Sequence, residues 1–92
     1  MGEFHRDRLP DPAEFFDAQG LALKGSRVWK QARCVFHEEA HPSLSVNVDT
    51  GAFRCFACGT AGGDIVAFYR QRTGASFVEA ARALGAWQEA GR

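Results

Sequence analysis

The chain has 92 residues, and 46% of them are hydrophobic. Eleven basic side chains balance eleven acidic ones, and this zero net charge argues against a protein that binds polyanions through its overall charge. No apolar run approaches the roughly 20 residues that cross a bilayer, and the polar residues 1–8 do not resemble a signal peptide. The sequence therefore predicts one small, soluble, cytoplasmic domain without a membrane partner.

The first predicted element is a helix that follows residue 10. Asp11 is a suitable N-cap, Pro12 suits the first helical position, and Glu14 is the reciprocal partner of a capping box. Gly20 can end this helix. The preceding residues 1–10 are predicted to be a flexible arm.

Three strands are predicted next. Residues 27–33 form a plausible strand, and residues 43–48 alternate polar and apolar side chains, which is typical of a half-buried strand. After a turn that ends in glycine, residues 52–56 return as the second strand of a hairpin. Because side chains alternate along a strand, Phe53 and Cys55 should share one face.

Two short helices complete the predicted fold. Asp64 can begin the first of them, which should end before Gly74, and Ser76 with Glu79 forms a capping box for the second, which should end before Gly85. The fold class is thus α+β, an antiparallel hairpin or sheet flanked by short helices.

Two pairs of metal-ligand residues lie among these elements. Cys34-Val-Phe-His37 and Cys55-Phe-Ala-Cys58 each have two intervening residues, and 17 residues separate the pairs. This spacing lets two turns bring four side chains to one tetrahedral ion, and three thiolates with one imidazole suit Zn²⁺. Four protein ligands leave no position for water, so the sequence predicts one structural zinc rather than a catalytic metal.

Other interpretations of these residues remain open. A disulfide between Cys55 and Cys58 would leave Cys34 over, and a thioredoxin-like pair should open a helix, whereas this pair runs into glycines. His41 competes with His37 for the fourth ligand position, although the two-residue spacing favours His37. The zinc site would carry a formal charge of about −1, which neighbouring cations could balance.

The same residues resemble the N-terminal zinc-binding domain of bacterial and phage-type DNA primases. The resemblance rests on the first pair with the following Pro42-Ser43-Leu44-Ser45-Val46, on Phe53-Arg-Cys-Phe-Ala-Cys-Gly59, and on Gly62-Gly63-Asp64-Ile65-Val66-Ala67-Phe68. It extends from the helix near Asp11 to the helix that ends at Leu84. Val35 and Leu44 depart from the Pro and Phe that are usual in that family.

This resemblance implies a zinc-ribbon domain over residues 11–86, followed by a tail over 87–92. It also implies that the domain binds single-stranded DNA and helps to hold the template, while a separate catalytic domain synthesises the primer; a helicase is a further candidate partner. The chain shows no clustered acidic residues for magnesium, so by itself it should not synthesise primers.

Basic residues concentrate before the first cysteine, where four cations occur without an acid. Together with one aromatic residue and one later arginine they are the predicted DNA contacts, since single-strand binders combine cations for phosphates with aromatic side chains for bases. These candidates are Lys24, Arg27, Trp29, Lys30, Arg33 and Arg54. Arg33 and Arg54 could instead balance the thiolates. The alternative function is a zinc-stabilised protein interaction module that docks on a replication or regulatory partner without contacting DNA.

Overall fold

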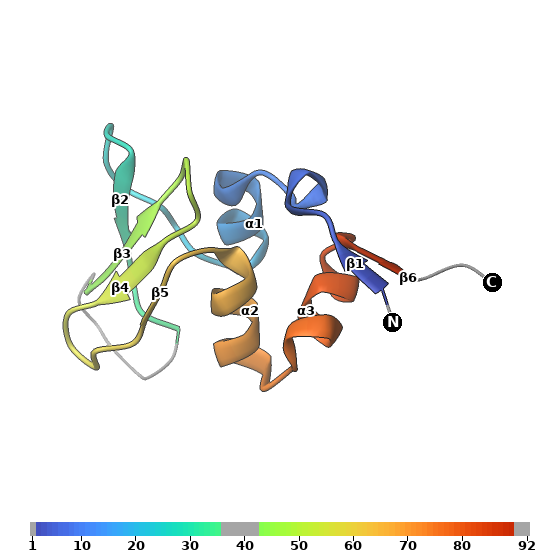
Figure 1. The fold of residues 1–92 in the computed structure, drawn as a ribbon. Coiled ribbons are helices and arrows are strands. Elements are labelled where there is room, and N and C mark those ends of the chain that lie inside the picture. Colours follow the sequence, from blue (N-terminus) through green and yellow to red (C-terminus); the bar gives the residue numbers. More distant parts are fainter. Residues whose placement is uncertain (1, 36–42, 90–92) are drawn as a thin grey trace.

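The computed structural model describes residues 2–35 and 43–89 and confirms an α+β fold (Figure 1). In chain order the elements are β1 (Gly2–Phe4), η1 (Arg6–Arg8), α1 (Pro12–Ala18), β2 (Trp29–Ala32), β3 (Leu44–Asn47), β4 (Phe53–Cys55), β5 (Ala61–Gly62), α2 (Ile65–Thr73), α3 (Phe77–Ala83) and β6 (Trp87–Glu89). A four-stranded sheet lies at one end of the molecule and a two-stranded sheet at the other, with the helices between them. Among the described residues, no helix is long and apolar enough to cross a membrane.

The four-stranded sheet is antiparallel, with strand order β2-β3-β4-β5. Leu44 lies opposite Cys55, and Val46 lies opposite Phe53. All four side chains are buried, so alternate positions of β3 and β4 form an inner face that points toward the helices. The predicted hairpin, with Phe53 and Cys55 on one face, is confirmed.

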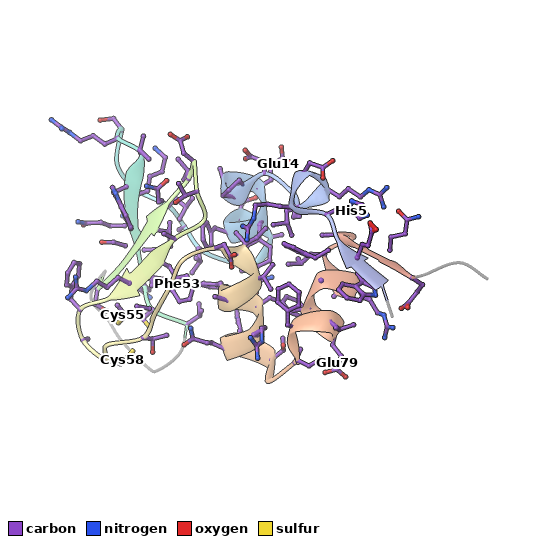
Figure 2. All side chains as sticks on the ribbon, in the orientation of Figure 1. His5, Glu14, Phe53, Cys55, Cys58 and Glu79 are labelled. Atoms are coloured by element: carbon purple, nitrogen blue, oxygen red, sulfur yellow. The ribbon has the colours of Figure 1, made fainter. Side chains whose placement is uncertain are left out.

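Phenylalanine rings attach this inner face to α1 and α2. The ring of Phe68 on α2 lies edge-on to those of Phe15, Phe16 and Phe53, at centroid distances of 5.7, 5.1 and 5.0 Å. Figure 2 shows Phe53 between the sheet and α2. Such edge-to-face contacts add about 0.5–1.5 kcal/mol per pair to the gain from apolar burial. Both helices therefore cover one side of the sheet and leave its outer side to solvent.

Local capping explains where the helices begin. Asp11 and Asp64 each accept a hydrogen bond from the amide of the third helical residue, at 3.2 and 2.9 Å. Ser76 and Glu79 form a complete capping box, and α2 ends at Gly74, whose φ is 79°. These contacts satisfy amides that have no partner within the helix, and the predicted helix starts are confirmed.

The two ends of the chain differ from their prediction. The sequence predicts an arm over residues 1–10 and a tail over 87–92 without regular structure, yet β1 and β6 pair as a two-stranded antiparallel sheet in which Phe4 lies opposite Trp87. Phe4 also packs edge-on against Phe77 of α3, with ring centroids 4.9 Å apart. Strands of three residues have no recognisable periodicity, and each partner lies more than 80 residues away in the sequence, so the pairing leaves no local signal.

Candidate functional site

The three cysteines converge at the edge of the four-stranded sheet. Cys34 follows β2, Cys55 ends β4, and Cys58 lies in the turn after it. Their sulfur atoms all lie within 4.8 Å of one another, and the Sγ atoms of Cys34 and Cys58 are 3.9 Å apart. A tetrahedral zinc with Zn–S bonds of about 2.3 Å requires sulfur atoms about 3.8 Å apart. The cluster therefore fits one structural zinc.

A tight turn holds the second pair of ligands. The amide of Cys58 donates to Sγ of Cys55 at 3.5 Å, and the amide of Gly59 donates to the Cys55 carbonyl at 2.9 Å. Gly59 has a φ of 78°, a backbone conformation that glycine adopts without strain. Figure 2 shows Cys55 and Cys58 close together at this end of the molecule, away from α3. The two-residue spacing thus produces the turn that a zinc ligand pair requires.

The surroundings of Cys55 favour its thiolate. Burial raises the pKa of this thiol, but hydrogen bonds from the Ser43 hydroxyl and from the backbone and side chain of Cys58 outweigh that effect and lower the pKa from its ordinary 9.0 to about 6. Hydrogen bonds lower a thiol pKa because they stabilise its charged form. The Sγ–Oγ distance to Ser43 is 3.5 Å. Since the thiolate is the metal-binding form, Cys55 is prepared for Zn²⁺ near neutral pH.

The alternatives for the cysteines fit the structure less well. No disulfide joins the three cysteines, and the pair Cys55 and Cys58 lies in a turn after a strand instead of opening a helix. Residues 36–42 lie outside the described part of the chain, and so do both candidate histidines, His37 and His41. His37 therefore remains the predicted fourth ligand.

The outer face of the sheet carries a continuous row of polar residues. Ser45 on β3 lies opposite Arg54 on β4 and opposite Gln31 on β2. Lys24 extends the row beyond β2, because it pairs with Gln31 through two backbone hydrogen bonds of 2.8 and 2.9 Å. Directly paired residues of antiparallel strands face the same side. Arg54, Ser45, Gln31 and Lys24, called the polar row below, therefore share the face opposite the core.

Two exposed aromatic side chains flank the polar row. Trp29 is 50% exposed and Phe56 is 69% exposed; together with Ser45 and Arg54 they line a shallow pocket. The Arg54 guanidinium lies over the Phe56 ring at 5.3 Å from its centroid. Because Arg54 and Cys55 are neighbours in a strand, they point to opposite faces. Arg54 therefore contacts an aromatic ring on the outer face rather than balancing the thiolates.

Of the other predicted DNA contacts, Lys30 is the one that the strand register places away from the outer face. Lys30 lies opposite the buried Val46, and its ammonium donates to the Gly25 carbonyl at 2.8 Å, so it is not on the face of Trp29. Arg27 is exposed in the bend before β2. Arg33 follows β2 and lines a second pocket together with Lys24.

Phe56 is absent from the predicted contacts. It is the most exposed large apolar side chain among the described residues. Its position two residues after Arg54 places it on the outer face by strand alternation. The alternation that places Phe56 on the face of Arg54 was therefore present in the sequence.

In a zinc ribbon, the ends of antiparallel strands and the turn that follows them bring cysteines together around one ion. The four-stranded sheet and the cysteine cluster have this arrangement. Residues 17–90 match the CHC2 zinc finger, the zinc ribbon of DnaG-type primases. The chain belongs to this family, which confirms the predicted resemblance.

Relatives and a solved structure agree with this assignment. The DNA primase of Mycolicibacterium smegmatis is 47% identical over 51 residues, which cover 55% of this chain and 8% of that protein. The DNA primase of Chlamydia pneumoniae is 41% identical over 63 residues, which cover 68% of this chain and 10% of that protein. The crystal structure of the zinc-binding and RNA polymerase domains of the Aquifex aeolicus primase aligns with a TM-score of 0.69 at 29% identity, over 83% of this chain and 18% of that one. The chain spans about a tenth of the length of the curated primases that it matches.

Proposed function

We propose that this zinc ribbon binds single-stranded DNA on the outer face of its four-stranded sheet and holds the template for a primase-like replication system. The observation that carries the proposal is the position of two exposed aromatic side chains, Trp29 and Phe56, on the same face as Arg54 and the polar row. Single-strand binders combine a cationic track for the backbone with aromatic side chains on which bases stack.

The dimensions of the face suit a short stretch of strand. Three steps between neighbouring strands, at about 4.8 Å each, separate the backbones of Arg54 and Lys24 by about 14 Å. That distance corresponds to about four stacked nucleotides at about 3.4 Å each. Trp29 and Phe56 lie on either side of this track, where bases can reach them.

The metal centre contributes indirectly to this function. It joins the end of β2 to the end of β4 through Cys34 and Cys55, which are the strands that carry Trp29 and Arg54. Rigid placement of these groups lowers the entropy cost of ordering them on the strand. Primer synthesis itself would fall to a separate polymerase domain, such as the one in the Aquifex protein, and a helicase is a further candidate partner.

The experiment is a titration of the zinc-loaded protein with labelled single-stranded oligonucleotides at 50 and 200 mM salt. Trp29→Ala should weaken binding by about 1–3 kcal/mol without changing the salt dependence, because stacking releases no counterions. Arg54→Ala should reduce the log–log salt slope by about 0.7, the value for one phosphate contact. Arg82→Ala removes an exposed cation from α3, beyond the helices that cover the sheet, and is the control that should bind like the parent.

Two results would contradict the proposal. One is the absence of binding at 50 mM salt, and the other is equal affinity of all three variants. Either result would favour the protein interaction module, because Val28, Trp29 and Phe56 are exposed apolar side chains that could also contact a protein.

A further inference from the structure

A second pocket lies at the Lys24 end of the polar row. The hydrogen bonds between Lys24 and Gln31 are the last backbone pairing at this edge of the sheet. Past this pair the two segments separate, and residues 20–22 and residues 32–35 border a pocket of about 490 Å³. This volume is in the range of sites that hold small organic groups. Its lining includes Leu21, Ala22, Lys24, Ala32, Arg33 and Val35.

The lining combines an apolar floor with a cationic rim. Leu21 and Ala32 are each 3% exposed, and Val35 is half-buried. Lys24 and Arg33 are exposed at the rim, and among the described residues that line the pocket none is acidic. An apolar floor with two adjacent cations suits a ligand that carries a flat, weakly polar group next to an anion.

The wall formed by residues 20–22 is held in place by the helices. The amide of Leu21 donates to the Phe16 carbonyl at 3.2 Å, and the guanidinium of Arg72 on α2 donates to the Gln19 carbonyl at 2.7 Å. The first contact ties this wall to the buried Phe16, and the second, which is exposed, ties the preceding residue to α2. The pocket is therefore formed before a ligand arrives, which reduces the cost of binding.

We propose that this pocket receives one nucleotide from the end of the strand bound on the outer face. The base packs against Val35 above the floor formed by Leu21 and Ala32, while Lys24 and Arg33 contact the adjoining phosphate, and the Gln31 amide lies at the rim within the polar row. The inference rests on the proposed function and adds an end site to it. A nucleotide of the strand is favoured over a free nucleotide, because Lys24 belongs both to the pocket and to the track that guides the strand.

Methyl NMR of the zinc-loaded protein tests the pocket directly. An eight-residue thymidine oligonucleotide should shift the methyl signals of Leu21 and Val35, because the ring current of a base acts only at short range. An eight-residue strand of abasic sites carries the phosphates without bases and should leave these methyl signals in place. Thymidine triphosphate at the same concentration should shift them less than the oligonucleotide.

A pair of substitutions provides the matched control. Ala22→Phe places a ring at the exposed rim of the pocket and should weaken oligonucleotide binding at least about fivefold, because the ring occupies the space of the base and removes its apolar burial. Ala83→Phe adds the same ring to an exposed position of α3 and should bind like the parent. Equal thermal stability of the two variants would show that both are folded.

The outcomes separate the inference from the proposed function. If the oligonucleotide binds but the Leu21 and Val35 methyl signals do not move, the pocket inference is overturned and the proposed function stands. If no oligonucleotide binds, both fail. If the free triphosphate shifts the two methyl signals as strongly as the oligonucleotide, the pocket binds mononucleotides and the assignment to the strand is wrong.

Discussion

At the scale of single residues, Gly51 determines how closely the hairpin approaches α2. It is buried in the turn between β3 and β4 with a φ of 84°, and its amide donates to the Asn47 carbonyl at 2.8 Å. A Cβ atom at this position would lie 2.8 Å from Cγ2 of Ile65 and 2.9 Å from its backbone nitrogen. Both the backbone conformation and the lack of space therefore require glycine.

Gly51→Ala should accordingly destabilise the fold more than Gly85→Ala. Gly85 has a similar φ of 77°, but a Cβ atom there would have no described atom within 4 Å. Gly85→Ala should cost only the backbone strain of about 1–2 kcal/mol, while Gly51→Ala adds an overpacking cost of about 1–3 kcal/mol. Urea unfolding of the zinc-loaded proteins measures both values. Equal losses of stability would mean that the turn moves away from Ile65 without cost.

At the scale of elements, Asp64 connects α2 with the N-terminal part of the chain. Its Oδ1 caps α2 by accepting from the Ala67 amide at 2.9 Å, while its Oδ2 accepts from the Arg6 guanidinium at 3.1 Å. Arg6 lies in η1 and also stands over the Phe4 ring at 5.3 Å. One carboxylate thus starts a helix and contacts the segment that follows β1.

Substitutions at this carboxylate should separate its two roles. Asp64→Ala removes the cap and the ion pair and should cost about 1–2 kcal/mol, of which about 1 kcal/mol belongs to the cap. Asp64→Asn keeps an oxygen acceptor and should cost well under 1 kcal/mol, because the Arg6 side chain is 66% exposed and exposed ion pairs contribute little. Thermal or urea unfolding is the measurement, with Arg6→Ala as the control for the ion pair alone. If Asp64→Asn proves as unstable as Asp64→Ala, the negative charge of Asp64, and not its oxygen acceptor, has the main role.

At the scale of the whole molecule, the zinc supplements a small hydrophobic core. A domain of this length buries only about 60–70% of the surface of its unfolded chain, and the cysteine cluster lies at the end of the sheet away from α3 (Figure 2). Cys34 and Cys55 belong to the same buried cluster as Phe53 and Phe68, so metal binding reinforces the core at this end of the sheet, since zinc binds the folded site and not the unfolded chain. The sheet end should depend on zinc more strongly than the helical end.

Acidification in the presence of a chelator should remove the zinc and destabilise the sheet. The folded pKa of Cys55, about 6, lies below its ordinary 9.0, so the stability contributed by its thiolate is complete above about pH 9, declines as the pH falls toward 6, and is lost below that value. Protons thus compete with zinc for Cys55 mainly below pH 6. Zinc release, measured with a chromogenic chelator, should begin below that pH, while thermal stability, measured in parallel, should decline gradually from about pH 9 and fall further as the metal leaves.

The same pH series with excess zinc is the control for that experiment. Excess metal should oppose the release by mass action. Zinc loss with a midpoint above pH 7 would contradict the lowered pKa of Cys55, which keeps this ligand in its thiolate form near neutral pH. Unchanged thermal stability after the metal has left would contradict its structural role.

Features that depend on neighbouring residues were predictable from the sequence. The caps Asp11, Asp64 and Ser76 act on amides three residues away, and the pair Cys55 and Cys58 forms a turn within four residues. The alternation from Leu44 to Val46 likewise identifies the buried side of a strand. Each of these signals comes from backbone geometry over a few residues, so the structure could confirm it.

Features that depend on distant pairing were not predictable in the same way. β5 has two residues, and β1 and β6 have three each. Such strands are too short to show an alternation of polar and apolar residues, and the packing of the whole chain determines which strands they pair with. The position of Lys30 is an intermediate case. Strand alternation alone places it opposite to Trp29, but only the contact with Gly25 shows what its ammonium binds.

The sequence by itself determined the family and the kind of metal, because ligand spacing and ligand chemistry are local properties. His37 still rests on that spacing. Only the tertiary structure decided which cations can act together with the aromatic side chains. Arg54 and Lys24 join one face through strand register, while Lys30 lies on the other side of the sheet. Register depends on hydrogen bonds between segments far apart in the chain, and no run of neighbouring residues encodes it.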